Sequence, residues 1–274
     1  MARRWNPYAW ERAELGLARY IGSCCACFKY LVATPWFHAN QTNRFARGTL
    51  ALQDELGYRS SAIPAKHVWE LFPGVEEAEV KLGRLLPDDG SSISFREMVV
   101  LCSIIRYENA HVVFEFGTSN GVTTLNIALN LPWDGIAYTL DLPPARADQT
   151  VISTAYRVSV SDRKMMFANR ECRRFLSSTV EAQVRQLYGD SATFDYSPYQ
   201  GRCDVVFVDG AHSLKYVESD TRAALQLVRP GGVVIWHDYN DGFFWPDVHR
   251  CLNRLARDHV IHRIRGTMFA VARA

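Results

Sequence analysis

Short hydrophobic runs that end in polar residues recur through the second half of the chain. They lie at 112–116, 135–141, 203–209 and 233–238. Between them, the segments 122–131 and 213–229 place apolar residues at helical spacing. Continuous apolar runs are typical of strands buried on both faces, and their alternation with helices is typical of an open parallel sheet. The pattern therefore predicts an α/β fold whose polar strand ends lie along one edge of the sheet.

A glycine-rich turn follows the first predicted strand. The strand ends at Glu115, and the chain continues through Gly117, Thr118, Ser119 and Gly121 into the predicted helix. Glycine allows the chain to turn tightly and a ligand to come close to the backbone. The helix that begins here directs its free N–H groups and its positive dipole end at the same place. The turn is therefore a candidate binding site for a nucleotide-like cofactor.

Polar side chains close the neighbouring strands. Asp141 stands 24 positions after Gly117 (141 − 117) at the end of the next strand. In dinucleotide sites, a carboxylate about 20 residues past such a turn accepts hydrogen bonds from ribose hydroxyls. Asp209 opens the sequence Asp-Gly-Ala-His that ends at His212, and the pair His237–Asp238 closes the last of these strands. Residues that could bind a ligand or transfer a proton thus lie at the carboxyl ends of successive strands.

Together these motifs resemble the class I S-adenosylmethionine-dependent methyltransferases, and within them a group that acts on small molecules. Its signature is E-x-G-x-x-x-G after the first strand, D-G-x-H after the fourth, and P-G-G followed by H-D around the fifth. The matching residues are Glu115, Gly117, Gly121, Asp209, Gly210, His212, Pro230, Gly231, Gly232, His237 and Asp238. The resemblance covers the chain from Ser94 to its end. It implies a Rossmann-like, seven-stranded, mostly parallel sheet with a C-terminal antiparallel hairpin, and S-adenosylmethionine as the cofactor.

The resemblance also implies a role for each strand end. Glu115 and the glycine turn would face the methionine part of the cofactor, and Asp141 would bind the ribose hydroxyls. Asp190 would accept from the adenine amino group, and Asp209 would lie beside the transferring methyl group. The full set of implied cofactor-binding residues is Glu115, Gly117, Thr118, Ser119, Gly121, Asp141, Asp190, Ser191 and Asp209.

Two ways of activating the methyl acceptor stay open. The sulfonium carbon is already electrophilic, so the enzyme has to align the acceptor and remove its proton. His212, His237 and Asp238 are the candidate catalytic residues, and histidine titrates near neutral pH. Alternatively, Asp209 and Asp238 bind Mg²⁺, which acidifies the substrate hydroxyl, as related oxygen methyltransferases do with acids after these strands. A hydroxyl oxygen of a small metabolite or sugar is the expected acceptor in both cases.

Functions of other classes explain parts of the pattern. Residues 117–121 fit the G-x-S-x-G turn of α/β-hydrolases, and Ser119, Asp209 and His237 follow in the hydrolase order of a catalytic triad. An esterase would leave Asp141 without a role, and its nucleophile normally follows several strands, whereas the sequence before residue 110 is mainly helical in pattern. A nicotinamide dehydrogenase is disfavoured because Val122 stands in place of the third glycine. A non-catalytic cofactor-binding partner subunit stays open.

Residues 1–92 are predicted to form a mainly helical N-terminal extension, and residues 93–274 the cofactor-binding domain. The capping box from Ser94 to Glu97 predicts a helix that runs to about residue 107. Pro246 suits the first turn of a further helix. The apolar segments on either side of Gly266 predict the terminal hairpin.

The segment between Leu142 and Tyr188 is longer than one helical crossover requires. It holds eight Lys or Arg residues against four acids. Such charges commonly form a solvated helix face. A segment above the carboxyl ends of strands can also bind substrate, and Arg173 and Arg174 would then favour an acidic or phosphorylated molecule.

Composition narrows the class of protein. A chain of 274 residues with 48% hydrophobic content can build a large core. The formal net charge of +2 gives no broad basic field for nucleic acid, so a small-molecule substrate is the expected partner, and a homo-oligomer is compatible with the sequence. Seven cysteines and no visible signal peptide favour reduced thiols in a cytoplasmic protein. No apolar stretch reaches the roughly 18 residues of a membrane span.

Overall fold

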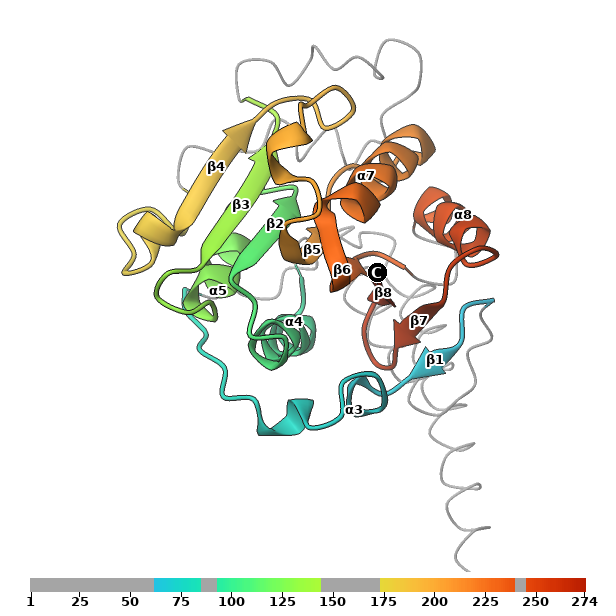
Figure 1. Ribbon diagram of the computed structural model, residues 1–274, viewed down its shortest axis with the longest axis horizontal. Coiled ribbons are helices and arrows are strands. Elements are labelled where there is room, and N and C mark those ends of the chain that lie inside the picture. The colour runs from blue at the N-terminus through green and yellow to red at the C-terminus, as the bar shows by residue number, and fades with distance from the viewer. Residues whose placement is uncertain (1–61, 85–92, 144–172, 240–244) are drawn as a thin grey trace, which may run out of the picture. The chain divides into compact units, whose positions relative to one another are not determined.

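Figure 1 shows the fold in a computed structural model, which describes residues 62–84, 93–143, 173–239 and 245–274. The strands are β1 (Ala65–Lys66), β2 (Val112–Phe116), β3 (Ile136–Asp141), β4 (Val184–Tyr188), β5 (Cys203–Val208), β6 (Val228–Trp236), β7 (Ile261–Ile264) and β8 (Ala270–Arg273). The α-helices are α3 (Val68–Leu71), α4 (Phe95–Tyr107), α5 (Val122–Leu129), α7 (Leu214–Leu227) and α8 (Pro246–Leu255). Most of the predicted N-terminal extension lies outside the described residues, so its structure and the domain boundary at residue 92 stay predictions.

All of these strands form one sheet with the order β1-β7-β8-β6-β5-β2-β3-β4. The strands from β6 through β4 in this order are parallel, whereas β8 pairs antiparallel with both β6 and β7. The predicted mostly parallel sheet with an antiparallel C-terminal hairpin is confirmed. The predicted sheet has seven strands, and β1 adds an eighth through its pairing with β7. A strand of two residues leaves no hydrophobic pattern by which the sequence could reveal it.

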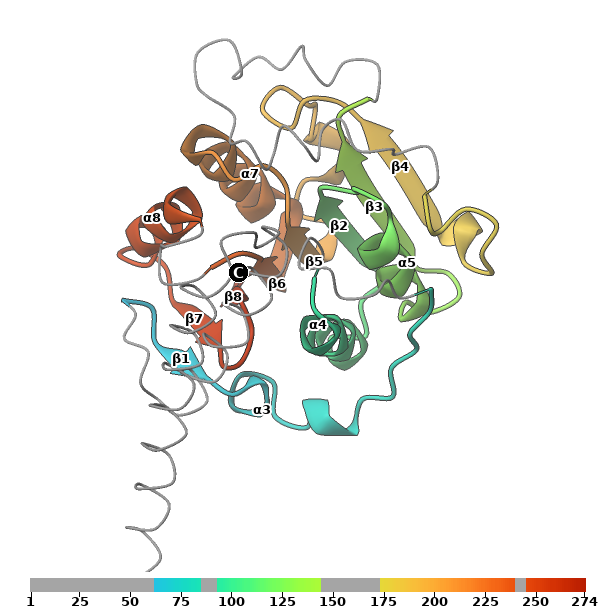
Figure 2. The same cartoon turned by 180° about the vertical axis from the view of Figure 1, so that it is seen from behind.

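Helices cover both faces of the sheet, as Figures 1 and 2 show from opposite sides. On one face, Val217 of α7 and Leu252 of α8 pack with Phe114 and Val206 of the central strands. On the other face, α4 and α5 pack against the alternate residues of the same strands, among them Val205. Side chains of a strand alternate between its two faces, and both faces here meet helices. This explains why the central strands are apolar throughout.

The ends of two helices follow their sequence signals. Ser94 is the N-cap of α4: its hydroxyl accepts from the N–H of Glu97, and the Glu97 carboxylate accepts from the N–H of Ser94 at 2.9 Å. The predicted capping box is therefore confirmed. Pro246 occupies the first turn of α8, where its missing N–H costs no helical hydrogen bond.

Three cysteine side chains lie buried within the described part of the chain. Burial raises the pKa of Cys102 and Cys203 to about 12 and that of Cys251 to about 11. All three are free thiols, and such groups behave as small apolar residues in a core. Among the described helices, none is long and apolar enough to cross a membrane.

Gly117 sets how closely the ends of β2 and β5 approach each other. Its φ is +90°, and a Cβ atom at this position would lie 2.1 Å from the carbonyl oxygen of Asp209. The sequence predicted that this glycine lets a ligand approach the backbone. What approaches it in the structure is the backbone of Asp209 and Gly210. The glycine is needed because two strand ends of the site meet there.

We expect the substitution Gly117→Ala to destabilise the chain more than Gly74→Ala. Gly74 has a similar φ of +93°, but a Cβ atom there would meet nothing within 4 Å. Both variants therefore bear the cost of a left-handed alanine, about 1–2 kcal/mol, and only Gly117→Ala adds a steric clash with backbone. Urea unfolding should show a further loss of about 2 kcal/mol or more for Gly117→Ala. Equal losses in the two variants would contradict this explanation.

Candidate active site

Backbone hydrogen bonds continue past the carboxyl ends of the parallel strands. They run from the N–H groups of Gly117, Gly189, Asp209 and His237 to the carbonyl groups of Leu140, Asp141, Phe116 and Val208 respectively. Each turn that leaves a strand is thereby held beside the strand next to it. The predicted site residues at these ends consequently share one edge of the sheet.

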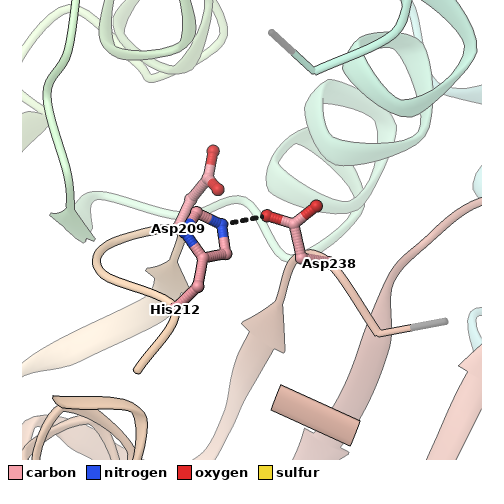
Figure 3. Close-up of side chains that lie close together, drawn as sticks. All are labelled: Asp209, His212 and Asp238. Atoms are coloured by element: carbon pink, nitrogen blue, oxygen red, sulfur yellow. Dashed lines mark hydrogen bonds and ion pairs between the residues drawn. The ribbon is translucent and has the colours of Figure 1, made fainter. Parts of the chain in front are cut away.

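Three potential metal ligands or proton-transfer groups converge at this edge. Asp209 follows β5, His212 lies three residues later, and Asp238 follows β6 (Figure 3). One ligand atom from each of them lies within 4.8 Å of the others. His212 Nε2 donates to Asp238 Oδ2 at 2.6 Å, and the His212 ring stacks on Trp245 with 3.8 Å between ring centroids. A carboxylate and an aromatic ring thus fix the orientation of this histidine.

The backbone of Asp238 is strained where it presents its carboxylate. Its φ is +60°, a conformation that costs a non-glycine residue about 1–3 kcal/mol. Such strain persists only where surrounding contacts impose it, and it clusters at functional sites. Burial disfavours the charge of Asp238, but His237 and His212 hold the pKa of its carboxyl well below its usual range.

A cavity opens directly beside this cluster. The polar residues that line it are Asp209, His212, His237 and Asp238, and its apolar walls include Val217, Trp236 and Val248. Small-molecule sites have this kind of lining, mainly apolar with a few convergent polar groups. The free space here is about 20 Å³, so the cavity is a small recess at the strand ends. Its polar end is formed by two carboxylates and two imidazoles.

His237 lies beneath the cluster and faces carboxylates on both sides of its ring. Nδ1 donates to Asp209 Oδ1 at 3.0 Å and lies 3.3 Å from Asp238 Oδ2, while Nε2 lies 3.6 Å from Glu97 Oε2. The ring is 5% exposed. Burial works against its charge, but Asp238 and Asp209 raise the pKa of His237 well above its ordinary value. His237 is therefore a buried cation enclosed by acids.

Glu97 is a part of this site that the sequence pointed to only as a helix cap. It is buried in α4, and its Oε1 accepts from the N–H of Met268 at 2.7 Å, in the turn of the terminal hairpin. Burial favours the neutral acid, but His237, the N–H of Met268 and Ser94 lower the pKa of Glu97 to about 2. One carboxylate thus joins the start of α4, the hairpin turn and His237.

Glu115 lies deeper than its implied role beside the cofactor requires. It is 1% exposed, and its Oε2 accepts from the hydroxyls of Thr124 and Thr139 at 2.5 and 2.6 Å. Burial raises the pKa of Glu115 to about 8 despite these two hydrogen bonds, and the nearby acids Asp209 and Asp141 add to the rise. Its Oε1 has no partner among the described residues. Glu115 in its neutral form still has one oxygen, Oε1, that can accept a hydrogen bond from a cationic group of a ligand.

Asp141 lies at the end of β3 as predicted, but protein groups surround its carboxylate. Oδ2 accepts from the N–H of Ser119 at 3.0 Å and lies 3.2 Å from Arg173 Nη1, while Oδ1 accepts from the N–H of Leu142. Arg173 Nη1 also donates to the carbonyl oxygen of Ser119. The sequence placed Arg173 in a basic segment facing solvent or substrate. In the structure it is 5% exposed and lies against the predicted ribose-binding residue.

The predicted adenine-binding residues lie past β4, which is next to β3. Asp190 Oδ2 accepts from the Tyr216 hydroxyl at 3.0 Å, and Ser191 is hydrogen-bonded to the buried Asp220. Burial raises the pKa of Asp220 to about 7. Two residues of α7, one turn apart, therefore hold the loop that carries Asp190 and Ser191.

Thr118 and Gly121 complete the glycine turn. The Thr118 hydroxyl is buried and lies 2.7 Å from that of Thr139, so it belongs to the same network as Glu115. Gly121 has a φ of +74°, and a Cβ atom there would lie 2.8 Å from the Phe175 ring. Both residues thus serve the packing of the turn in this structure. Their role in binding a cofactor stays a prediction.

The structure gathers the predicted site residues into two groups. Asp209, His212, His237 and Asp238 lie together at β5 and β6, and the glycine turn with Asp141 lies at β2 and β3. Sequence reasoning did not identify Glu97, Thr124 or Thr139 as part of the site. The spacing of strands and helices along the sequence does not predict which hydroxyl groups contact Glu115, here those of Thr124 and Thr139. The basic residues at 144–172 lie outside the described residues.

Residues 114–239 of the chain match a protein family described as a methyltransferase domain. The resemblance to class I S-adenosylmethionine-dependent methyltransferases is thereby confirmed over these residues. No curated protein matches the chain.

Solved structures to which the chain is similar include three methyltransferases. The O-methyltransferase TomG from Streptomyces achromogenes, in complex with S-adenosylmethionine, is 19% identical, with 77% of this chain and 91% of that chain covered and a TM-score of 0.44. An O-methyltransferase from Bacillus cereus with bound S-adenosylhomocysteine is 18% identical, covering 81% and 94%, with a TM-score of 0.44. The methyltransferase PaMTH1 from Podospora anserina is 14% identical, covering 87% and 97%, with a TM-score of 0.46.

We expect Glu97→Gln to lower stability strongly at neutral pH and weakly in acid. The pKa of Glu97 falls from 4.5 to about 2 on folding, so its charge stabilises the fold above pH 4.5 and this contribution disappears as the pH falls towards 2. A shift of this size corresponds to about 3 kcal/mol. Denaturant unfolding should show a difference from the native chain of about 3 kcal/mol at pH 7 and about 1 kcal/mol at pH 2.5.

Ser94→Ala is the matched control for this charge. It removes the hydroxyl that contacts Glu97 Oε2 at 2.7 Å but leaves the carboxylate and His237 in place. Its cost should be about 1 kcal/mol, the usual value for a lost N-cap. If Glu97→Gln lowers stability by the same amount at both pH values, the ionised Glu97 does not stabilise the fold.

Proposed function

We propose that this chain, whose residues 114–239 match a methyltransferase domain family, transfers a methyl group from S-adenosylmethionine to a hydroxyl oxygen of a small molecule. The observation that carries the proposal is the convergence of Asp209, His212 and Asp238 at a cavity on the carboxyl edge of the sheet. In open α/β sheets ligands bind at this edge. The glycine turn and Asp141, the proposed cofactor contacts, lie along the same edge.

His212 is the proposed general base. Its Nε2 is fixed by Asp238, so Nδ1 is the atom we propose as the proton acceptor. A base oriented by a third group is the recurring arrangement for activating a hydroxyl nucleophile. The His212 side chain is 11% exposed and borders the cavity, and the acceptor hydroxyl would enter there. Asp238 would then orient the base and stabilise the imidazolium that forms.

His237 receives a different role in this proposal from that of a base. Carboxylates face both of its ring nitrogens, and its pKa is raised well above the ordinary value, so it keeps its proton at neutral pH. We propose that it serves as a fixed cation which holds Asp209 and Asp238 close together. Without such a cation, two carboxylates at this distance would repel each other and take up protons.

A divalent metal ion fits the same cluster. Asp238 Oδ1 is buried and has no partner among the described residues. One ligand atom from each of Asp209, His212 and Asp238 lies within 4.8 Å of the others. Two carboxylates and an imidazole suit Mg²⁺ less well than an all-oxygen set, and they also suit Mn²⁺. When bound, such an ion would orient the acceptor hydroxyl and lower its pKa. Asp209 and Asp238 are the proposed ligands, and His212 stays the proposed base.

The geometry disfavours the hydrolase alternative. A catalytic triad needs a histidine nitrogen within hydrogen-bond reach of the serine hydroxyl. His237 directs Nδ1 at Asp209 and Nε2 towards Glu97. The N–H of Ser119, for its part, is bonded to Asp141. Within the described contacts, the predicted triad of Ser119, Asp209 and His237 is not assembled.

We expect His212→Asn to lower kcat by a factor of roughly 10²–10⁴, the usual contribution of a positioned base. The affinity for S-adenosylhomocysteine, measured by calorimetry, should stay within about twofold, because the base contacts the acceptor and not the cofactor. Transfer of labelled methyl groups from S-adenosylmethionine to a panel of hydroxylated small molecules gives the turnover. His259→Asn, which changes an exposed histidine outside the site, should leave both quantities unchanged. Unaltered turnover in His212→Asn would rule out His212 as the base.

We expect Mg²⁺ or Mn²⁺ to bind the chain after treatment with a chelator, and the binding to disappear in Asp238→Asn. The substitution removes the charge of the most buried proposed ligand, and a hard cation depends on that charge. Calorimetric titration with each ion gives the affinity, and turnover before and after the chelator shows whether the ion is required. If neither ion binds and the chelator has no effect, methyl transfer proceeds with His212 alone.

A further inference from the structure

A guanidinium group lies in the place where the proposed function puts the cofactor ribose. Arg173 Nη1 lies 3.2 Å from Asp141 Oδ2 and also donates to the carbonyl oxygen of Ser119. Both partners belong to the edge where the glycine turn meets the end of β3. Arg173 itself comes from a segment 32 residues further along the chain.

The carboxylate of Asp141 is enclosed by this contact. Its side chain is 10% exposed, and both of its oxygens accept hydrogen bonds or ion pairs from protein groups. A ribose diol binds through two adjacent hydroxyls that donate to a carboxylate. Oδ2 already has two donors, the N–H of Ser119 and Arg173 Nη1, so a ribose hydroxyl can bind this oxygen only if Arg173 leaves it. The ribose and the guanidinium are mutually exclusive partners of one acid.

The guanidinium is poorly accommodated where it lies. Arg173 is 5% exposed, and its Nε and Nη2 atoms have no hydrogen-bond partner among the described residues. A buried cation that leaves donors unmet bears a desolvation cost which a single ion pair offsets only in part. The contact with Asp141 is consequently one that a better partner can displace, with Arg173 then regaining water.

The backbone beside Arg173 is held independently of its side chain. Arg174 N–H donates to the carbonyl oxygen of Asn120, and the Phe175 ring packs under Gly121. Arg84 donates to the carbonyl oxygens of Arg174, Leu176 and Ser177. A rotation of the Arg173 side chain can therefore take the guanidinium away from Asp141 with the backbone of the turn left in place.

We propose that Arg173 is a built-in competitor for the ribose-binding carboxylate, which the cofactor has to displace from Asp141 when it binds. The inference rests on the proposed function, because it takes Asp141 as the ribose acceptor. It makes Arg173 a determinant of cofactor affinity. A site that is occupied by its own side chain binds with an apparent affinity reduced by the fraction of chains in which it is open.

The test compares two neighbouring arginines. Arg173→Met keeps the length of the side chain but removes its charge, and Arg174→Met makes the same change in net charge at the next, exposed position. Calorimetric titration with S-adenosylhomocysteine gives Kd for both variants and the native chain. Arg173→Met should bind about tenfold more tightly than the native chain, and Arg174→Met should bind like it. Cooperative thermal unfolding confirms that each variant is folded, and Arg173→Gln replaces Arg173→Met if that variant is not.

Each result has a separate meaning. Unchanged or weaker binding by Arg173→Met, or equal gains in both variants, would overturn the competition while native binding still upholds the proposed cofactor. Binding by Arg173→Met alone, with none by the native chain, would support the competition in its strongest form. If neither the native chain nor any variant binds S-adenosylhomocysteine, the competition and the proposed function both fail.

Discussion

A carboxylate that folding takes out of water has to acquire a cation, hydrogen bonds or a proton, and the carboxyl edge of this sheet buries several of them. This constraint determines how the site is assembled. Glu97 and Asp238 lie on opposite sides of His237, and each is about as buried as the imidazole between them. The protonated His237 is the cation that the carboxylates of Glu97 and Asp238 need, and these carboxylates in turn stabilise its charge. The cluster of acids that looks like a functional signal is therefore also an electrostatic unit, and removing one member destabilises the fold because another is left uncompensated.

The two halves of the edge satisfy the same constraint in different ways. At β5 and β6 the charges compensate one another and leave a cavity beside them. At β2 and β3 the acids depend on groups that a ligand can replace: Asp141 takes a guanidinium from Arg173, and Glu115 takes two hydroxyls and, at neutral pH, a proton. The proposed cofactor carries hydroxyl groups and positive charge. The protein side chains that now contact Asp141 and Glu115 also carry hydroxyl or cationic groups. In this proposal, protein groups occupy the cofactor side of the edge, while the acceptor side is already formed.

How far the sequence could predict this arrangement depends on the separation of the interacting residues. The strand ends, the glycine turn and the capping box of Ser94 and Glu97 are local patterns, and the structure has the turn and the helix start where those patterns place them. The strands at 112–116, 135–141 and 203–209 are also close to their predicted positions, whereas β6 begins at Val228, five residues before the apolar run that starts at 233. The contact of Glu97 with Met268 spans 171 positions, and that of Arg173 with Asp141 spans 32. Nothing in the spacing of charges predicts such pairings, because they follow from which segments the sheet order brings together. The sequence could therefore place Arg173 in a basic segment and could not place it at Asp141.

Backbone strain shows which parts of this edge are held and which are adjustable. Among the described non-glycine residues with positive φ, Ser119 and Asp238 lie at the edge itself, while Arg84 and Ser177 form the contact that secures the chain after Arg173. Such conformations persist only where surrounding contacts impose them, so these four backbone positions are over-determined. Long side chains keep several rotamers at little cost once they reach solvent, and a guanidinium with unmet donors gains from doing so. The backbone of this turn is rigid and Arg173 is its poorly accommodated side chain. We therefore expect the conformational change on ligand binding to be a rotation of the Arg173 side chain.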